Sequence, residues 1–175
     1  MKCEEVINIT GRYILLIVLA IGNLSAFYIV FTPLTAYPVF SILKLFYPAS
    51  LLINTSTLSI SGLYIELIPA CIAGAAYYLL LILNLATSLP FKTRIKSLAF
   101  LVISFLILNI IRILVFSWLF ISGNEYFFDI AHRFVWYIGS TILVLALWFL
   151  NVWLFKIKSI PVYTDIRAII KSIKR

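Results

Sequence analysis

Long apolar stretches separated by short polar segments dominate the chain. A helix needs about 20 apolar residues to cross the hydrocarbon core of a bilayer, which is about 30 Å thick. Four stretches are close to this length and carry at most one charged residue each, namely residues 13–31, 69–89, 98–121 and 135–155. This pattern predicts an all-α polytopic membrane protein with four transmembrane helices, or five if one further segment crosses the bilayer.

A further apolar stretch, residues 34–53, is interrupted by polar and helix-breaking residues. Lys44 lies near its middle, and the stretch also contains Pro38 and Pro48. A charge in the middle of the bilayer costs about 2.5 kcal/mol or more. We therefore expect an interfacial or re-entrant segment here, with a true fifth span as the alternative.

Residues 54–68 differ in pattern from the apolar stretches on either side. They are rich in β-branched and hydroxyl residues and contain a Ser61-Gly62 turn signal. These features predict a short β-hairpin-like segment directly before the stretch that contains the cysteine. Because non-helical backbone cannot face lipid, the hairpin should lie at the outer surface or be covered by protein.

The composition is that of a membrane protein and excludes an ordinary soluble domain. Hydrophobic residues make up 64% of the chain and charged residues 11%, whereas soluble domains have about 45–50% and about 25%. The net charge of +8 comes from short basic clusters between the apolar stretches. A nucleic-acid-binding protein would instead gather its basic residues on one solvated face, so we expect no nucleic-acid partner.

The distribution of lysine and arginine predicts the orientation, because these residues collect at the cytoplasmic ends of spanning helices. The basic segment 92–96 and the basic tail 156–175 are separated by two spans and are both expected in the cytoplasm. Residues 54–68 and 122–134 then lie outside the cell membrane. The N-terminus is inside if there are four spans, and outside if residues 34–53 form a fifth. The tail suits a cationic segment on the inner leaflet.

Cys71 and Arg112 are candidates for chemistry, because polar groups within lipid are expensive. Cys71 lies at the start of its apolar stretch, where a helix N-terminus would favour a thiolate; the alternative is a small buried apolar side chain. Arg112 is the only charge in residues 98–121, and Asn109 lies on the same helical face. The alternative for Arg112 is an arginine that reaches lipid headgroups.

His132, the only histidine, precedes the last apolar stretch. It is either a base or an ordinary interfacial polar group. Glu125 and Asp129 are candidates to orient its imidazole, with solvated charges as the alternative, and Arg133 follows His132 directly.

The predicted topology brings a thiol, a guanidinium and an imidazole to the outer side of the membrane. An imidazole can remove the proton of a thiol, the thiolate can attack a carbonyl, and a guanidinium can stabilise the resulting oxyanion. This combination indicates acyl transfer, which needs no cofactor. One histidine and two cysteines without paired carboxylates in a span disfavour a metal site.

Three short motifs, in this order, resemble those of the exosortase and archaeosortase family. They read Ala70-Cys71-Ile72-Ala73-Gly74, Asn109-Ile110-Ile111-Arg112 and Ala131-His132. The resemblance covers roughly residues 34–155, and the small size is similar to that of the short archaeal members, the pacearchaeosortases.

The resemblance implies a membrane-embedded cysteine protease and transpeptidase that acts on surface proteins with a C-terminal sorting signal. Such a signal consists of a short motif, a transmembrane helix and a basic tail. Cleavage at the outer leaflet would be followed by transfer to a lipid or another acceptor. The resemblance implies that Cys71 is the nucleophile and that Arg112 is the oxyanion-stabilising or substrate-positioning cation. His132 would be the base, with Asn109 and Arg133 as supporting residues, and the family leaves open whether histidine or arginine fills the third position.

A non-catalytic role is the competing interpretation. In a transporter subunit or an assembly factor, Arg112 would pair with a ligand or a partner helix, and Cys71 would be dispensable. The sequence leaves open the sorting motif, the acceptor, the choice between transfer and hydrolysis, and the oligomeric state.

Overall fold

The computed structural model describes residues 3–21, 24–48, 50–54, 56–60, 62–123 and 125–157. Most of the predicted basic tail therefore lies outside the described residues. In chain order the elements are α1 (Cys3–Ile21), α2 (Ser25–Phe46), β1 (Leu51–Leu52), β2 (Thr57–Ile60), β3 (Leu63–Glu66), α3 (Pro69–Ile72), α4 (Gly74–Leu85), α5 (Phe91–Ile121), α6 (Glu125–Phe134), the π-helical turn η1 (Val135–Gly139) and α7 (Ser140–Leu154).

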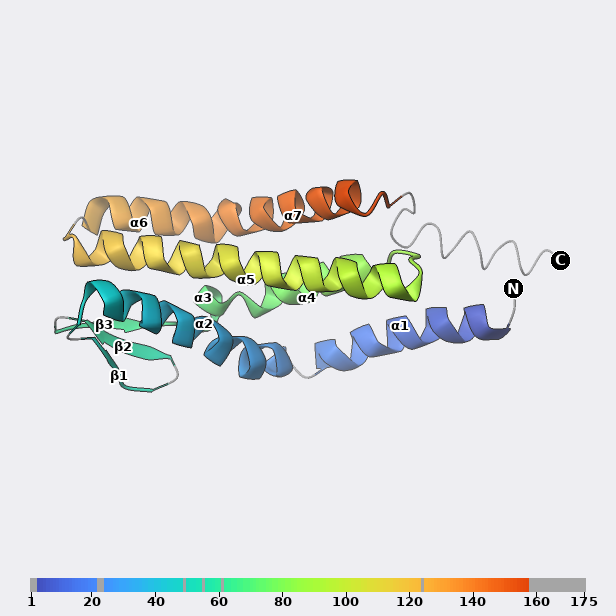
Figure 1. Cartoon of the computed structure of the whole chain (residues 1–175), viewed down its shortest axis with the longest axis horizontal. Helices are drawn as coiled ribbons and strands as arrows, with labels where there is room; N and C mark the ends of the chain where they lie inside the picture. The colour runs from blue at the N-terminus through green and yellow to red at the C-terminus, as the bar shows by residue number, and fades with distance from the viewer. Residues whose placement is uncertain are drawn as a thin grey trace.

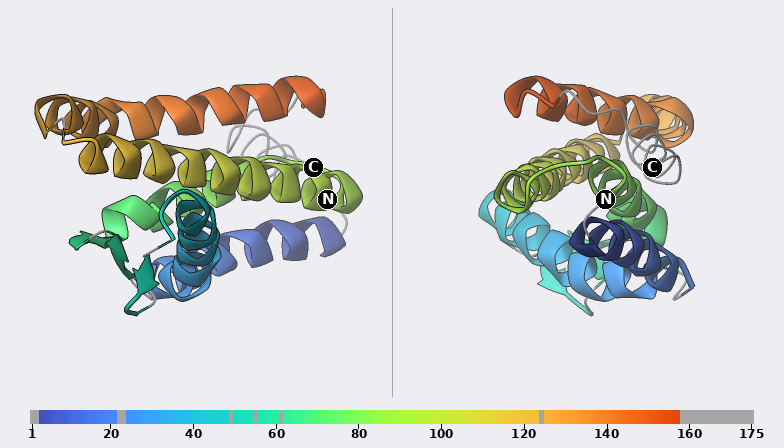
Figure 2. Two further views of the ribbon diagram at one scale, coloured as in Figure 1. Left: turned by 60° about the vertical axis from the view of Figure 1, so that its left-hand side comes forward. Right: turned by 90° about the vertical axis from the view of Figure 1, so that its right-hand side faces the viewer.

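The helices lie side by side along one axis, with the small sheet at one end (Figure 1). Helices α6 and α7 form one layer, α5 and α4 the middle layer, and α1 and α2 the third, as both views of Figure 2 show. Helix α5 is central and contacts α2, α3, α4, α6 and α7. The connection from α4 to α5 and the end of α7 lie at the end opposite the sheet (Figure 1).

Among the residues that the structure describes, three helical segments are long and apolar enough to cross a membrane, namely Ser25–Phe46, Phe91–Ile121 and Tyr126–Leu154. The described part of the chain also has two shorter apolar helical segments, Ile9–Ile21 and Pro69–Leu85. A mostly helical fold of this kind is compatible with a membrane protein.

The structure divides the first apolar residues differently from the prediction. A break at Leu24, whose φ is 59°, falls inside the predicted span 13–31, and residues 34–46 belong to a single helix, Ser25–Phe46, that is long enough to span. Lys44 lies in the last turn of this helix, 5.6 Å from the centre of the Phe40 ring. Lys44 thus lies at one end of this helix rather than near its middle, and a cation at a helix C-terminus is favourable.

The later boundaries also differ from the prediction. Residues 69–89 are not one helix, because the chain breaks at Ala73 between α3 and α4. Residues 92–96, expected between two spans, belong to the first turns of α5, and most of residues 122–134, also expected between two spans, form helix α6. Hydropathy detects where apolar segments lie, whereas breaks and caps depend on contacts with other elements.

The predicted hairpin is present and is extended to a three-stranded antiparallel sheet in the order β1-β2-β3. Gly62, in the turn between β2 and β3, has a φ of 86°, which favours glycine. Leu58 and Ile60 of β2 are fully buried in one apolar cluster with Ala36 and Val39 of α2. This cluster fixes the sheet against the helices just before the cysteine.

The buried face of α5 repeats every four residues and carries polar as well as apolar side chains. Its members are Ser97, Leu101, Phe105, Asn109, Ile113 and Ser117. Ser97 accepts a hydrogen bond from Asn84 Nδ2 (2.8 Å) and donates to Asn151 Oδ1 (2.9 Å). This network joins α4, α5 and α7 at the end away from the sheet, as polar side chains often do between membrane helices.

Two arginines bind the carbonyl groups at the end of α4. Arg12 Nη1 of α1 donates to Leu85 O (2.8 Å) and Thr87 O (3.0 Å). Arg94 donates to Asn84 O (2.8 Å) and Thr87 O (2.9 Å). Because the last carbonyls of a helix have no partner within it, such side chains stabilise its end.

Candidate active site

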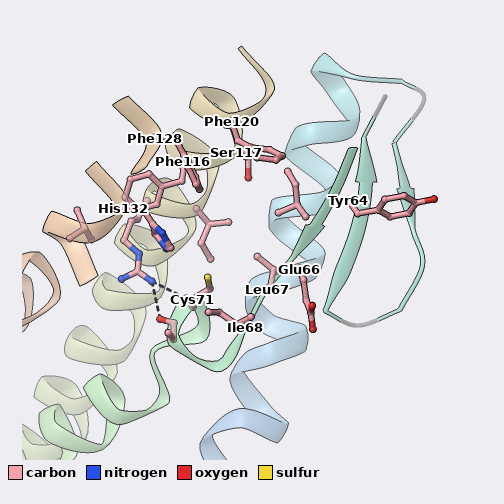
Figure 3. Close-up of a pocket in the computed structure, with 15 residues that line it drawn as sticks. Tyr64, Glu66, Leu67, Ile68, Cys71, Phe116, Ser117, Phe120, Phe128 and His132 are labelled. Atoms are coloured by element: carbon pink, nitrogen blue, oxygen red, sulfur yellow. Dashed lines mark hydrogen bonds between the residues drawn. The ribbon is translucent and has the colours of Figure 1, made fainter. Parts of the chain in front are cut away.

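A cavity of about 220 Å³ opens between the sheet, α3, α5 and α6. Cys71, Arg112 and His132 all line it, together with apolar side chains that include Phe116 and Phe128. Figure 3 shows the Cys71 thiol and the His132 imidazole on the same side of this cavity. The three candidate residues predicted from the sequence thus line one cavity, and they come from three different helices, α3, α5 and α6.

The backbone around Cys71 is a single helical turn followed by a sharp break. Ile68 is extended and Pro69 begins α3, and the Cys71 amide donates to Ile68 O at 2.8 Å. Ala73 then adopts the left-handed conformation (φ 58°, ψ 41°) and α4 begins at Gly74. A left-handed alanine costs about 1–2 kcal/mol, so other contacts must stabilise the break.

Asn109 and Arg112 of α5 supply these contacts. Asn109 Nδ2 donates to Cys71 O (3.0 Å) and more weakly to Ile72 O (3.4 Å). Arg112 Nη2 donates to Cys71 O (2.9 Å) and to Ala70 O (3.4 Å), as the dashed lines in Figure 3 show. The break leaves the carbonyl groups of Ala70, Cys71 and Ile72 without helical partners, and Asn109 and Arg112 bind them. Arg112 therefore does not extend to lipid headgroups.

The Arg112 guanidinium keeps donors available for a second partner. Among the described residues only its Nη2 atom makes hydrogen bonds, and a guanidinium has five N–H donors. Tyr77 of α4 lies close enough to interact with the charge of Arg112. Its hydroxyl is buried and has no hydrogen-bond partner within the described part of the chain. Tyr77 was not among the predicted site residues, and it does not line the cavity itself.

His132 is held by aromatic rings rather than by a carboxylate. Its imidazole stacks on Phe128 (5.3 Å, 19°) and meets the edge of Phe116 (5.5 Å, 78°). No hydrogen bond joins it to Cys71 in the described structure, and such bonds are often long before a substrate binds. Phe116 and Phe128 line the cavity with His132, so the imidazole is packed against aromatic rings at the cavity wall.

Arg133 is not brought into the site. It pairs with Asp129 one helical turn earlier, and both side chains are more than half exposed. Asp129 thus bonds Arg133 and not His132, and Arg133 does not line the cavity. Of the two residues considered for the third position, the geometry therefore favours His132.

Two further features of the site were not predicted. Residues 64–68, from β3 and the segment after it, line the cavity, and so do Ser117 and Phe120 of α5. Directly after α6, the turn Val135–Gly139 is π-helical, a distortion that often occurs at functional sites. The four-residue spacing of the buried face of α5 was the signal in the sequence that could have identified Ser117.

Comparisons with known proteins identify no relative. No family model matches the chain, and neither a curated protein nor a solved structure matches it. In the described residues, histidine, cysteine and carboxylate side chains form no group of three that could hold a metal ion.

Proposed function

We propose that this chain is a membrane-embedded cysteine protease and transpeptidase of the exosortase and archaeosortase type. It cleaves the C-terminal sorting signal of surface proteins at the outer leaflet and transfers them to a lipid or another acceptor. The observation that carries the proposal is the convergence of Cys71, Arg112 and His132 on one cavity. Polar side chains are expensive in an apolar chain, so three of them from separate helices at one cavity favour a shared chemical role over local packing.

Each residue has a defined part in the proposed reaction. Cys71 gives its proton to His132, and the thiolate forms a bond to the scissile carbonyl carbon. Arg112 stabilises the oxyanion that develops. The C–N bond then breaks, His132 returns the proton to the departing amine, and a thioester remains on Cys71. An acceptor hydroxyl or amine, or water, gives its proton to His132 and attacks the thioester, which releases the product and restores the thiol.

The position of the cavity in the bundle agrees with action at the outer leaflet. Lysine and arginine collect at the cytoplasmic ends of spanning helices. Lys92, Arg94 and Lys96 are at the start of α5, at the end of the bundle opposite the sheet (Figure 1). The end that carries the sheet and the cavity is then the outer one, where the substrate's motif precedes its membrane helix.

The proposal is tested by co-expression with a candidate surface protein that carries a motif, a helix and a basic tail. Mass analysis of its C-terminus compares the wild type with Cys71→Ala, and Cys3→Ala serves as the matched control for loss of a thiol. Cysteine-dependent truncation with added lipid mass indicates a transpeptidase, and truncation alone indicates a protease. Processing that is unchanged in Cys71→Ala contradicts the proposal.

A non-catalytic membrane protein, such as a transporter subunit or an assembly factor, is the second candidate. It is favoured by one observation, namely that Arg112 already binds the carbonyls of Ala70 and Cys71 within the chain. In that case Arg112 serves the fold and Cys71 is dispensable. Loss of function in Arg112→Ala together with full function in Cys71→Ala would identify this alternative.

A further inference from the structure

The strand β3 forms the edge of the sheet, with β2 on one side only. Leu67 N donates to Ser56 O at 2.7 Å, and Tyr64 and Glu66 pair with Ser59 and Thr57. In an antiparallel ladder with this register, the N–H and C=O groups of Tyr64 and Glu66 point away from β2. The free edge of β3 therefore consists of the backbone of these two residues.

Most of these outward groups have no partner. Glu66 O accepts a bond from Ile68 N at 3.2 Å. Among the described residues no hydrogen bond satisfies Tyr64 N–H, Tyr64 C=O or Glu66 N–H. Unpaired backbone groups are costly wherever water is excluded, so this edge favours an occupant that carries complementary donors and acceptors.

The free edge lies in the wall of the cavity that contains the candidate nucleophile. Tyr64 and Glu66 line this cavity with Cys71, and β3 leads directly into α3. Figure 3 shows the side chains of Tyr64 and Glu66 turned away from the Cys71 thiol. What these residues offer to the cavity is therefore their backbone rather than their side chains.

The opposite wall is apolar and suits the side chains of a bound strand. Ile113, Phe116 and Phe120 of α5 line it. A peptide in extended conformation presents backbone donors and acceptors toward one neighbour, and its side chains alternate between two faces. A lipid chain could fill the apolar space but would leave the backbone of β3 unsatisfied, so a peptide fits both walls better.

We propose that an extended segment of the substrate polypeptide binds as an additional strand on the free edge of β3, next to Cys71. This inference rests on the proposed function and names the form in which the substrate is recognised. Pairing with Tyr64 and Glu66 engages about two to three substrate residues, given a rise of about 3.3 Å per residue. Backbone pairing supplies affinity, and the apolar wall of α5 selects side chains.

Peptide electrophiles test strand pairing without knowledge of the sorting motif. The probe is a pool of N-acetyl tetrapeptide chloromethyl ketones with randomised side chains, and N-acetylglycine chloromethyl ketone is the matched small electrophile. Alkylation of Cys71 in the full-length protein in detergent is followed by mass spectrometry. Two to three backbone hydrogen bonds should make the peptide pool react about tenfold faster or more.

Methylation of single amides gives the signature of a strand. Two further pools carry one N-methyl group, on either the second or the third amide counted from the chloromethyl ketone. Because neighbouring N–H groups of a strand point to opposite sides, one pool should lose the rate advantage and the other should keep most of it. Equal rates for both methylated pools, or a peptide pool no faster than the small electrophile, would overturn strand pairing.

A pair of variants tests the protein side of the interaction. Tyr64→Pro removes an outward N–H and spares the ladder to β2, since proline is tolerated on edge strands, whereas Tyr64→Ala keeps the N–H. We expect Tyr64→Pro alone to lose the peptide advantage while still reacting with the small electrophile. Two outcomes distinguish failure of the proposed function from failure of strand pairing. If neither probe alkylates Cys71 in the wild type, the thiol is inert and the proposed function fails together with this inference. If the small electrophile reacts and the peptide has no advantage, only strand pairing fails.

Discussion

Replacing Arg112 with lysine separates the charge of this residue from its shape. The guanidinium reaches Cys71 O at 2.9 Å and Ala70 O at 3.4 Å through one nitrogen, which leaves its other N–H groups for a substrate oxyanion. An ammonium keeps the positive charge but is a compact group without a planar fork of donors. Lysine therefore cannot hold the carbonyls of α3 and face the scissile carbonyl at the same time.

The expected effects on stability and on rate differ in size. A hydrogen bond to a charged donor contributes about 1.5–3 kcal/mol, so weakening the shorter contact should lower the free energy of unfolding by about 2 kcal/mol. Removal of one oxyanion donor lowers reaction rates about 10²–10³-fold, which corresponds to about 3–4 kcal/mol in the transition state. We expect Arg112→Lys to remain folded and to cleave its substrate at least about 100-fold more slowly.

Arg94→Lys is the matched control, because Arg94 makes the same kind of contact at the opposite end of α5. Its guanidinium donates to Asn84 O and Thr87 O at 2.8 and 2.9 Å, away from the cavity. Unfolding is followed by titration with a denaturing detergent, and cleavage by the rate at which the substrate's C-terminal fragment appears. Arg94→Lys should lose similar stability and keep its rate within about threefold. Equal loss of rate in both variants, or a normal rate in Arg112→Lys, would refute the catalytic role of Arg112.

Three further substitutions test the architecture around the site by the same unfolding titration. Ala73→Gly should raise stability by about 0.5–1 kcal/mol, because glycine adopts the left-handed conformation of this position without strain; a loss of stability would mean that the break is absent. Gly74→Ala should lower the free energy of unfolding by about 1 kcal/mol, since the new Cβ would lie 2.8 Å from the Tyr28 ring. Adding Tyr28→Leu to this variant should restore part of the lost stability. Ser97→Ala leaves two buried asparagine side chains without a partner and should cost about 2 kcal/mol or more, with alkylation of Cys71 unchanged.

Much of the candidate site could be predicted from local properties of the sequence. Cys71 and Arg112 stand out because a polar group in an apolar stretch is rare and expensive, and His132 stands out as the only histidine. The four-residue spacing that places Asn109 on the buried face of α5 is likewise a property of one helix. The choice between His132 and Arg133 could not be made in this way, because it depends on the ion pair with Asp129.

The sequence by itself determined that the chain is a mostly helical, apolar protein with a small β segment before its cysteine. Hydropathy, turn residues and β-branched residues are local signals, and they suffice for the type of each element. The tertiary structure decided where the helices break and which polar groups meet. Asn109 and Arg112 stabilise the left-handed turn after Cys71 although they are distant along the chain. The free edge of β3 lies in the wall of the cavity that also contains Cys71 because the sheet packs against α2. Contacts between elements distant in sequence set these features, and no local pattern encodes them.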